Sequence, residues 1–316
     1  MAVEVVRERW KGRVIEVTLG REPNRVSFGG DGALPFLHFE GPIPHRPAVV
    51  LEVWDRVDGD FPPLLAGAFG PVLQDPAEWA RRAVALGADM VALRLVSTDP
   101  DGFNAGAPEA VNGAQAVAAA VDVPLIVLGC GVESRDAEVL PAVAAALEGR
   151  GCLIGTVTAE NYRPVVEACK IHGHAVVATS PLDINLAKQL NILITDAGLP
   201  LERIVMDPSI GPLGYGLDYA YSIMERMRLG ALGGDRMLAP PVVCFVGYEA
   251  WKTKEALAVD RPEWGEQAER AVLWEAVTAA TLAQAGGSLF VFRHPEAMRR
   301  FQKQIGELMA GWRDER

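Results

Sequence analysis

Short, uninterrupted hydrophobic runs rich in Val, Ile and Leu recur along the chain from residue 48 onward. Strands of a parallel sheet produce such runs, because helices cover both faces of the sheet and keep it away from water. The runs predict eight buried strands, at residues 48–54, 89–95, 124–129, 152–156, 175–179, 203–207, 242–246 and 288–293.

The segments between these runs carry the spacing of amphipathic helices. We expect helices at residues 76–86, 108–120, 134–147, 160–172, 181–197, 218–232, 264–285 and 295–309. Two of them begin with capping signals, Asp75-Pro76-Ala77-Glu78 and Ser180-Pro181-Leu182-Asp183, which place a capping side chain before a proline at the first helical position. Eight strands alternating with eight helices predict an α/β fold of the (β/α)8 TIM-barrel type rather than an open sheet.

The first part of the chain has a different pattern. Residues 13–19 alternate between polar and apolar, residues 20–24 have turn-forming composition, and residues 25–28 are again extended. This pattern predicts a β-hairpin that either caps the open bottom of the barrel or packs on a neighbour. No low-complexity linker follows it, so we expect a hairpin extension at 1–46 and a barrel at 47–316.

Composition narrows the class of protein. The 316 residues are 50% hydrophobic and carry a formal charge of −11. An acidic surface repels nucleic-acid phosphates and anionic lipid, so neither is an expected partner. The N-terminus shows no apolar signal-peptide core, and no apolar run is long enough to span a bilayer; we therefore expect a soluble, cytoplasmic protein.

The four cysteines, Cys130, Cys152, Cys169 and Cys244, are widely separated. A disulfide framework, a zinc site or an iron–sulfur cluster would each need closely spaced or paired thiols. We expect reduced, mostly buried thiols. Cys130 lies between two glycines, which favours a tight turn over a nucleophile.

Chemistry in a (β/α)8 barrel takes place at the C-terminal ends of the strands and in the loops that follow them. No lysine ends a predicted strand, and of the five histidines only His294 lies at the top of the barrel, directly after a strand. This argues against Schiff-base chemistry and against a binuclear metal site. Tyr248 and Glu249 begin a long polar loop running to Pro262, whose length favours contact with a ligand or partner. The strand ends suit binding, and we predict neither catalytic nor metal-binding residues.

The loop richest in glycine and proline follows the sixth predicted strand and reads DPSIGPLGYG, residues 207–216. Its glycines and prolines predict a rigid surface with few side chains, which a large, flat ligand could approach closely. Asp207 either caps this loop or binds a ligand, with neither role favoured. Ser180, Asp183 and Asp75 are interpreted as helix caps rather than ligand-binding residues.

Four segments resemble the small (delta-type) subunit of the corrinoid iron–sulfur protein, in the family of the acetyl-CoA decarbonylase/synthase complex. They are residues 93–106 (LRLVSTDPDGFNAG), 179–194 (TSPLDINLAKQLNILI), 207–232 (DPSIGPLGYGLDYAYSIMERMRLGAL) and 240–256 (PPVVCFVGYEAWKTKEA). These are long runs rather than short motifs, and the layout of eight strand–helix units agrees over nearly the whole chain.

The resemblance implies a barrel related to pterin-binding methyltransferases and paired with a larger subunit that holds an iron–sulfur cluster. A corrinoid would lie between that subunit and the mouth of this barrel. A methyltransferase would bring the methyl group from methyltetrahydrofolate to the cobalt, for delivery to CO dehydrogenase/acetyl-CoA synthase in the reductive acetyl-CoA (Wood–Ljungdahl) pathway. The chemistry would then belong to the corrinoid rather than to side chains of this chain.

The residues themselves agree with this picture. The scattered cysteines suit a subunit without a cluster, and the DxHxxG corrinoid signature is missing, since Phe36 stands where Asp would precede His38. From strand-end positions alone, we predict that six residues lie near the corrinoid: Thr98, Asp207, Ser209, Gly211, Gly214 and Tyr215.

Two other functions remain open. A stand-alone pterin-dependent methyltransferase would use Asp99, Asn104, Asn161 and Asp207 to bind the pterin ring. A purely structural scaffold would fill the barrel mouth with its own side chains. Kinship of fold alone does not decide between functions.

Overall fold

The structure, a computed structural model, describes residues 6–57, 59 and 61–310. All eight predicted barrel strands are present, and they pair in parallel around a closed barrel in the order β10-β3-β4-β5-β6-β7-β8-β9. They are β3 (Ala48–Trp54), β4 (Met90–Arg94), β5 (Leu125–Leu128), β6 (Leu153–Val157), β7 (Ala175–Thr179), β8 (Ile204–Asp207), β9 (Val242–Cys244) and β10 (Gly287–Phe292). The predicted TIM-barrel fold is therefore confirmed.

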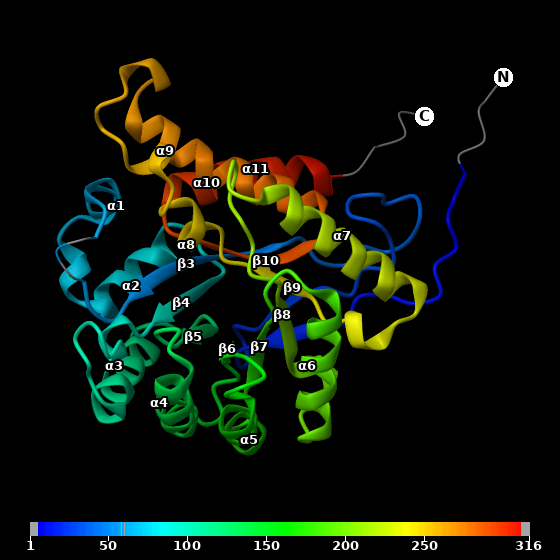
Figure 1. Ribbon diagram of the computed structural model, residues 1–316, viewed down its shortest axis with the longest axis horizontal. Coiled ribbons are helices and arrows are strands. Elements are labelled where there is room, and N and C mark those ends of the chain that lie inside the picture. Colours follow the sequence, from blue (N-terminus) through cyan, green and yellow to red (C-terminus); the bar gives the residue numbers. More distant parts are fainter. Residues whose placement is uncertain (1–5, 58, 60, 311–316) are drawn as a thin grey trace.

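The eight predicted helices surround the barrel (Figure 1). They are α2 (Pro76–Ala85), α3 (Ala107–Ala120), α4 (Glu133–Ala146), α5 (Tyr162–His172), α6 (Ile184–Asp196), α7 (Leu217–Gly233), α10 (Gln267–Gln284) and α11 (Pro295–Met309). Shorter helices occur in the connections: α1 (Pro63–Phe69), α8 (Val246–Ala250), α9 (Lys254–Leu257), and 3-10 turns at Gly70–Gln74, Val96–Thr98, Leu201–Arg203, Arg236–Leu238 and Pro262–Trp264. The segment expected as a loop from Tyr248 to Pro262 thus contains the end of α8 and the whole of α9, and the part from α9 onward projects from the barrel in Figure 1.

Alternation along the strands divides the core into two layers. In β3, Val49 and Leu51 face the helices and belong to the large outer core. Ala48 and Val50 point inward and pack with the inward residues of the other strands. Both layers are apolar because successive side chains of a strand point to opposite faces, and both faces are covered.

The helix starts test the capping predictions. Asp75 caps α2 as predicted, accepting hydrogen bonds from the backbone N–H groups of Ala77 (2.9 Å) and Glu78 (3.2 Å). At α6 the predicted cap Asp183 is confirmed, whereas Ser180 is not a cap and the helix begins at Ile184 rather than at 181. Leu182 has a φ of +43°, so the chain turns through the left-handed region before the helix begins and Ser180 is left outside it.

The N-terminal segment forms the predicted hairpin, with β1 (Val17–Leu19) antiparallel to β2 (Val26–Phe28). Val17, Leu19 and Phe28 are fully buried and pack in one cluster with the inward-facing barrel residues. Of the two placements expected, the structure shows the first: the hairpin closes the end of the barrel opposite to the strands' C-terminal ends.

In the parts of the chain that the structure describes, no helix combines the length and the apolar character needed to cross a membrane.

Candidate functional site at the barrel mouth

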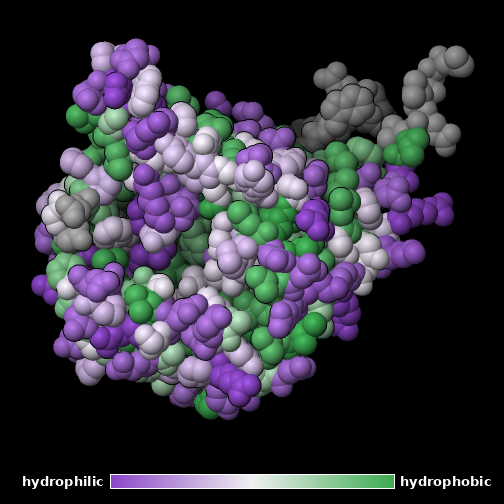
Figure 2. Space-filling model, viewed as in Figure 1, coloured by the Kyte–Doolittle hydropathy of each residue, from purple (hydrophilic) through white to green (hydrophobic). Residues whose placement is uncertain are grey.

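Charged side chains occupy the inside of the barrel at the C-terminal ends of its strands. Glu52 on β3, Arg94 on β4, Asp207 on β8 and Arg293 just after β10 continue the inward-facing rows that are apolar lower in the barrel. On the face drawn in Figure 2 the molecule is hollowed left of centre, near α8 and the ends of β3 and β4, and hydrophilic side chains surround the hollow.

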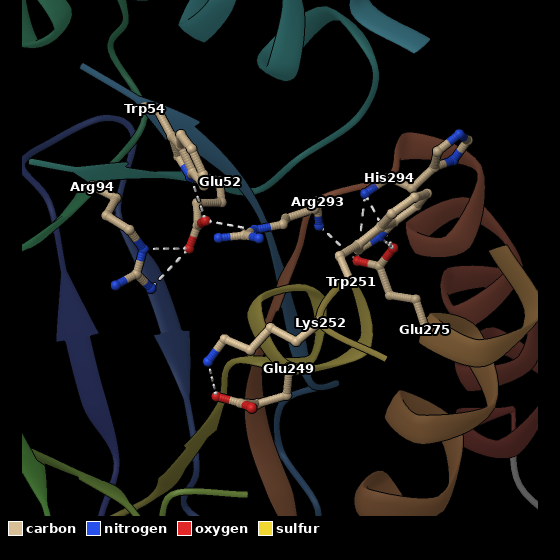
Figure 3. Close-up of polar contacts among 9 residues, drawn as sticks. All are labelled: Glu52, Trp54, Arg94, Glu249, Trp251, Lys252, Glu275, Arg293 and His294. Carbon is tan, nitrogen blue, oxygen red and sulfur yellow. Dashed lines mark hydrogen bonds and ion pairs between the residues drawn. The ribbon is translucent and has the colours of Figure 1, made fainter. Parts of the chain in front are cut away.

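Glu52 is the centre of this group (Figure 3). Its Oε2 accepts hydrogen bonds from Nε (3.0 Å) and Nη2 (2.9 Å) of Arg94. Its Oε1 accepts from Nε of Arg293 (2.8 Å) and from Nε1 of Trp54 (2.8 Å). Four donors thus surround one fully buried carboxylate, the arrangement that makes a buried charge tolerable.

The two arginines also fix the charge state of Glu52. Burial by itself would raise the pKa of Glu52, but the positive charges of Arg293 and Arg94 beside it outweigh burial and lower the pKa from 4.5 to about 2. The carboxylate is therefore ionised at every physiological pH, and it binds the two guanidinium groups together inside the mouth.

Tyr248, on α8, lies against this group with three cations over its ring. The guanidinium carbons of Arg94 and Arg293 lie 4.2 Å and 4.9 Å from the ring centroid, and Nζ of Lys252 lies 3.4 Å from it. Lys252 also pairs with Glu249 at 3.0 Å. Cation–π attraction of this kind holds α8 against the arginines, so that protein side chains fill the centre of the mouth.

A second buried carboxylate connects the end of α8 to the turn after β10. Glu275 on α10 accepts hydrogen bonds from Nε1 of Trp251 (2.8 Å) and from the backbone N–H of Arg293 (2.6 Å). Burial raises the pKa of Glu275 to about 7, despite these donors. Figure 3 shows Glu275 reaching both the turn that carries Arg293 and His294 and the side chain of Trp251.

The predicted ligand loop begins at Asp207, which is buried at the end of β8. Its Oδ1 accepts a hydrogen bond from the backbone N–H of Ser209 (2.9 Å) and its Oδ2 accepts one from the Thr179 hydroxyl (3.1 Å). Burial raises the pKa of Asp207 to about 6. Of the two roles left open for this residue, the capping of its own loop is present in the structure.

Three predicted residues of this loop gather around one pocket. Ser209, Gly211 and Tyr215 line a cavity of about 540 Å³, together with Glu249 of α8, the residues Lys252 and Thr253 just after it, and Tyr219 of α7. Tyr215 is 45% exposed, and its hydroxyl donates to Glu255 Oε2 (2.8 Å). At Gly211 a Cβ would lie 2.4 Å from the Tyr215 carbonyl oxygen, so only glycine allows the loop to fold back so tightly.

The other two predicted residues lie apart from this pocket. Gly214 has a φ of +78° and approaches Trp274 of α10. Thr98 is completely buried, and its hydroxyl donates to the carbonyl oxygen of Leu95 (2.8 Å) in a turn after β4. The structure therefore brings together Ser209, Gly211 and Tyr215, but neither Gly214 nor Thr98.

The residues that would bind a pterin ring are largely engaged in local contacts. Asn161 accepts from the backbone N–H of Thr158 (2.8 Å) and donates to the carbonyl oxygen of Thr156 (3.2 Å). Asp99 accepts from the N–H of Asp101 (2.9 Å). Asn104 Oδ1 accepts from Nη2 of Arg135, a residue of α4. These contacts hold the loops of the mouth in shape.

Sequence reasoning missed Glu52 and Arg94, because it searched the strand ends and the loops. Both residues interrupt apolar strands, AVVLEVW and MVALR, at inward-facing positions. A charge within a buried strand is the signal that could have identified them, since it requires a partner inside the barrel.

The arrangement as a whole is suited to binding. A rigid loop, an exposed tyrosine and a pocket lie beside a mouth whose centre holds fixed charges. Among residues 6–57, 59 and 61–310, no group of three or more His, Cys, Asp or Glu side chains is placed to hold a metal ion.

Comparison with solved structures shows which fold the chain shares with known proteins. Dihydropteroate synthase from Xanthomonas albilineans, solved with indole-2-carboxylic acid and 6-chloroguanine, has a TM-score of 0.59 at 17% identity, over 93% of this chain and 98% of that one. This likeness shows the barrel fold alone.

Comparison with related sequences shows the family of this chain. The acetyl-CoA decarbonylase/synthase complex subunit delta of Archaeoglobus fulgidus is 38% identical over 314 residues, which are 93% of this chain and 68% of the relative. The corresponding subunit of Methanopyrus kandleri is 37% identical over 88% of this chain and 69% of the relative. The family model of the CO dehydrogenase/acetyl-CoA synthase delta subunit matches residues 16–301. Because that match spans nearly the whole barrel and its hairpin, the chain belongs to the CO dehydrogenase/acetyl-CoA synthase delta subunit family.

Proposed function

We propose that this delta subunit holds a corrinoid across its barrel mouth, in a heterodimer with a larger subunit that carries an iron–sulfur cluster. The observation that carries the proposal is the position of the 540 Å³ pocket. It lies over the loop after β8 and beside α8, whereas Tyr248 and the two arginines fill the mouth next to it. A flat macrocycle fits across such a surface rather than down the barrel axis.

The residues present fit a flat, largely apolar ligand. Ile210, Pro212 and the Tyr215 and Tyr219 rings provide apolar surface around the pocket. Gly211 allows the loop to stay compact, so that no side chain stands between the backbone and a ligand. Asp207 and Ser209, joined by their hydrogen bond, hold the start of the loop against β8.

When bound, the corrinoid supplies the methyl-transfer chemistry through its cobalt. This chain's contribution is to orient the ligand and to exclude water from one of its faces. The ion pairs of Glu52 support this role, because they lock β3, β4 and β10 together beneath the loops that would touch the ligand. Thr98 and Gly214, also expected near the corrinoid, would act through the shape of neighbouring loops.

Further partners follow from the same proposal. The methyl group would come from methyltetrahydrofolate through a methyltransferase and go to CO dehydrogenase/acetyl-CoA synthase, in the reductive acetyl-CoA pathway and in the cytoplasm. The cysteines favour placing the cluster on the larger subunit, since Cys152, Cys169 and Cys244 are free thiols buried in the core and no group of three or more His, Cys, Asp or Glu among the described residues is placed to hold a metal ion.

The test is anaerobic purification of the tagged protein from its native host, with mass and visible spectrum read together. We expect a heterodimer with a larger chain, corrinoid absorption and a broad iron–sulfur shoulder. A Tyr215→Arg variant should lose corrinoid content, because it places a charged side chain in the pocket. Ile171→Arg is the matched control, since Ile171 is an exposed apolar residue near the end of α5, at the opposite end of the barrel.

Two results would reject the proposal. Equal corrinoid content in both variants would remove the loop from the site. A colourless monomer or homodimer that methylates added cobalamin from methyltetrahydrofolate would instead identify a stand-alone methyltransferase.

A further inference from the structure

A second pocket opens beside the first, between the start of α6 and the loop before α5. Its volume is about 360 Å³, and apolar side chains of α6 and of the turn before it form much of its wall, namely Pro181, Leu186, Leu190 and Leu193. Ser209 lines both pockets. A single ligand lying on the 540 Å³ pocket can therefore extend a group into the second one.

Ser180 lines the second pocket, and its hydroxyl is buried without a hydrogen-bond partner among the described residues. The residue as a whole is 3% exposed. Burial of an unpaired hydroxyl costs free energy. The cause is local: Asp183 caps α6, so the serine that precedes the turn has no helix terminus to bind.

Carboxylates surround the pocket and limit the ligands that it can accept. Glu133 and Glu160 line it, and Glu133 Oε1 accepts from the Thr158 hydroxyl (2.8 Å). Asp207 Oδ2 accepts from Thr179, which also lines the pocket. The two carboxylates that line the cavity repel an anionic group and favour a group that offers N–H donors.

We propose that this second pocket binds a primary carboxamide at the end of an apolar arm. The apolar stem packs against Leu186 and Leu190, the Ser180 hydroxyl donates to the amide oxygen, and the rim carboxylates accept from the amide N–H groups. This inference rests on the proposed function, because a corrinoid carries carboxamide arms around its ring. One arm would enter here while the ring covers the first pocket.

The experiment measures binding of benzamide to the full chain by calorimetry. Benzoate is the comparison probe, because it has a similar shape but carries a negative charge and no N–H donors. We expect saturable benzamide binding and much weaker benzoate binding. Ser180→Ala should raise the Kd for benzamide about fivefold, the usual value of one hydrogen bond. Ser222→Ala, at an exposed serine of α7, should leave the Kd unchanged.

Two further measurements separate binding from folding. Because the Ser180 hydroxyl is unpaired, Ser180→Ala should leave the free energy of unfolding unchanged or slightly higher in the absence of benzamide. Leu186→Trp should fill the pocket and abolish benzamide binding. The matched control is Leu229→Trp on α7, because Leu186 and Leu229 are similarly exposed, at 46% and 43%. The control variant should bind benzamide as the wild type does.

Equal affinity for benzamide in the wild type, Ser180→Ala and Leu186→Trp would overturn the inference, as would tighter binding of benzoate than of benzamide. A clear loss of stability in Ser180→Ala would also overturn it, because the hydroxyl would then already have a partner. Failure of the proposed function gives a different result: benzamide binds as expected, but the purified complex contains no corrinoid.

Discussion

Glu52 and Arg293 are 241 positions apart in the sequence, yet Nε of Arg293 donates to Oε1 of Glu52 at 2.8 Å with both side chains buried. Closure of the barrel explains the contact. β3 and β10 are the first and last strands of the barrel, and they become neighbours only when the sheet closes on itself. Arg94 on β4 completes the group from the other side of Glu52.

Replacing Glu52 by Gln should destabilise the fold strongly. The change leaves two buried guanidinium groups without a counter-charge, and breaking a buried pair in this way costs about 3–5 kcal/mol. Denaturant unfolding at pH 7 measures the loss. The control is Glu269→Gln, because Glu269 pairs with Arg300 at the surface and that change should have little effect. Equal stability of the wild type and Glu52→Gln would mean that the buried ion pairs contribute nothing to the fold.

The raised pKa of Asp207 predicts a specific dependence of stability on pH. Burial raises its pKa from 3.8 to about 6, so between these values the folded state binds the proton more tightly than the unfolded state does. The contribution of Asp207 to stability is therefore largest at low pH and falls as pH rises from about 4 to about 6. Two pH units correspond to about 3 kcal/mol as an order of magnitude.

Asp207→Asn removes this titration. The difference between the unfolding free energies of the variant and the wild type should change across pH 4–6 and be flat above about pH 7. Asp196→Asn, at an exposed aspartate at the end of α6, is the matched control and is measured over the same pH range. A flat difference for Asp207→Asn would show that Asp207 titrates normally in the folded protein.

The hairpin should stabilise the barrel that it closes. Phe28 is fully buried against the inward-facing barrel residues, and truncation of a buried phenylalanine to alanine costs about 3–5 kcal/mol. Phe28→Ala should therefore lower the melting temperature clearly. Phe39→Ala should not, because Phe39 is 44% exposed. Similar melting temperatures for the two variants would mean that the hairpin packs loosely on the barrel.

The cysteines should differ in reactivity. Burial raises the pKa of all four thiols, to about 12 at Cys152, so the difference between them comes from exposure. Only the half-buried Cys130 should react with a thiol reagent in the folded protein. Titration with Ellman's reagent should count at most one thiol before denaturation and all four after it. Cys130→Ser should abolish the native reaction, and persistence of that reaction would show that a core thiol is accessible.

The sequence was sufficient to predict the architecture, because a buried parallel strand and an amphipathic helix each leave a local pattern. Every barrel strand and every major helix was located from such patterns, and the hairpin was identified from its turn at residues 20–24. Asp75 was predicted as a cap for the same reason: its partners lie two and three residues away.

The site was only partly predictable. Ser209, Gly211 and Tyr215 were placed at the mouth because they follow a strand end, and they do line one pocket. Thr98 follows a strand end as well, but its side chain turns into a buried contact that strand-end position cannot reveal. Asp183 was predicted as a cap and is one, whereas Ser180, predicted to have the same role, is not, because Asp183 offers the same chemistry three residues later.

By itself, the sequence determined the order of strands and helices, the acidic surface and the rigid loop after β8, since each follows from neighbouring residues. Only the tertiary structure decided that Glu52 joins Arg94 to Arg293, that Tyr248 covers them, and that the Ser180 hydroxyl has no hydrogen-bond partner among the described residues. Those contacts depend on which strands become neighbours when the barrel closes and on how each loop returns across its mouth. Neither is encoded in residues close together in the chain.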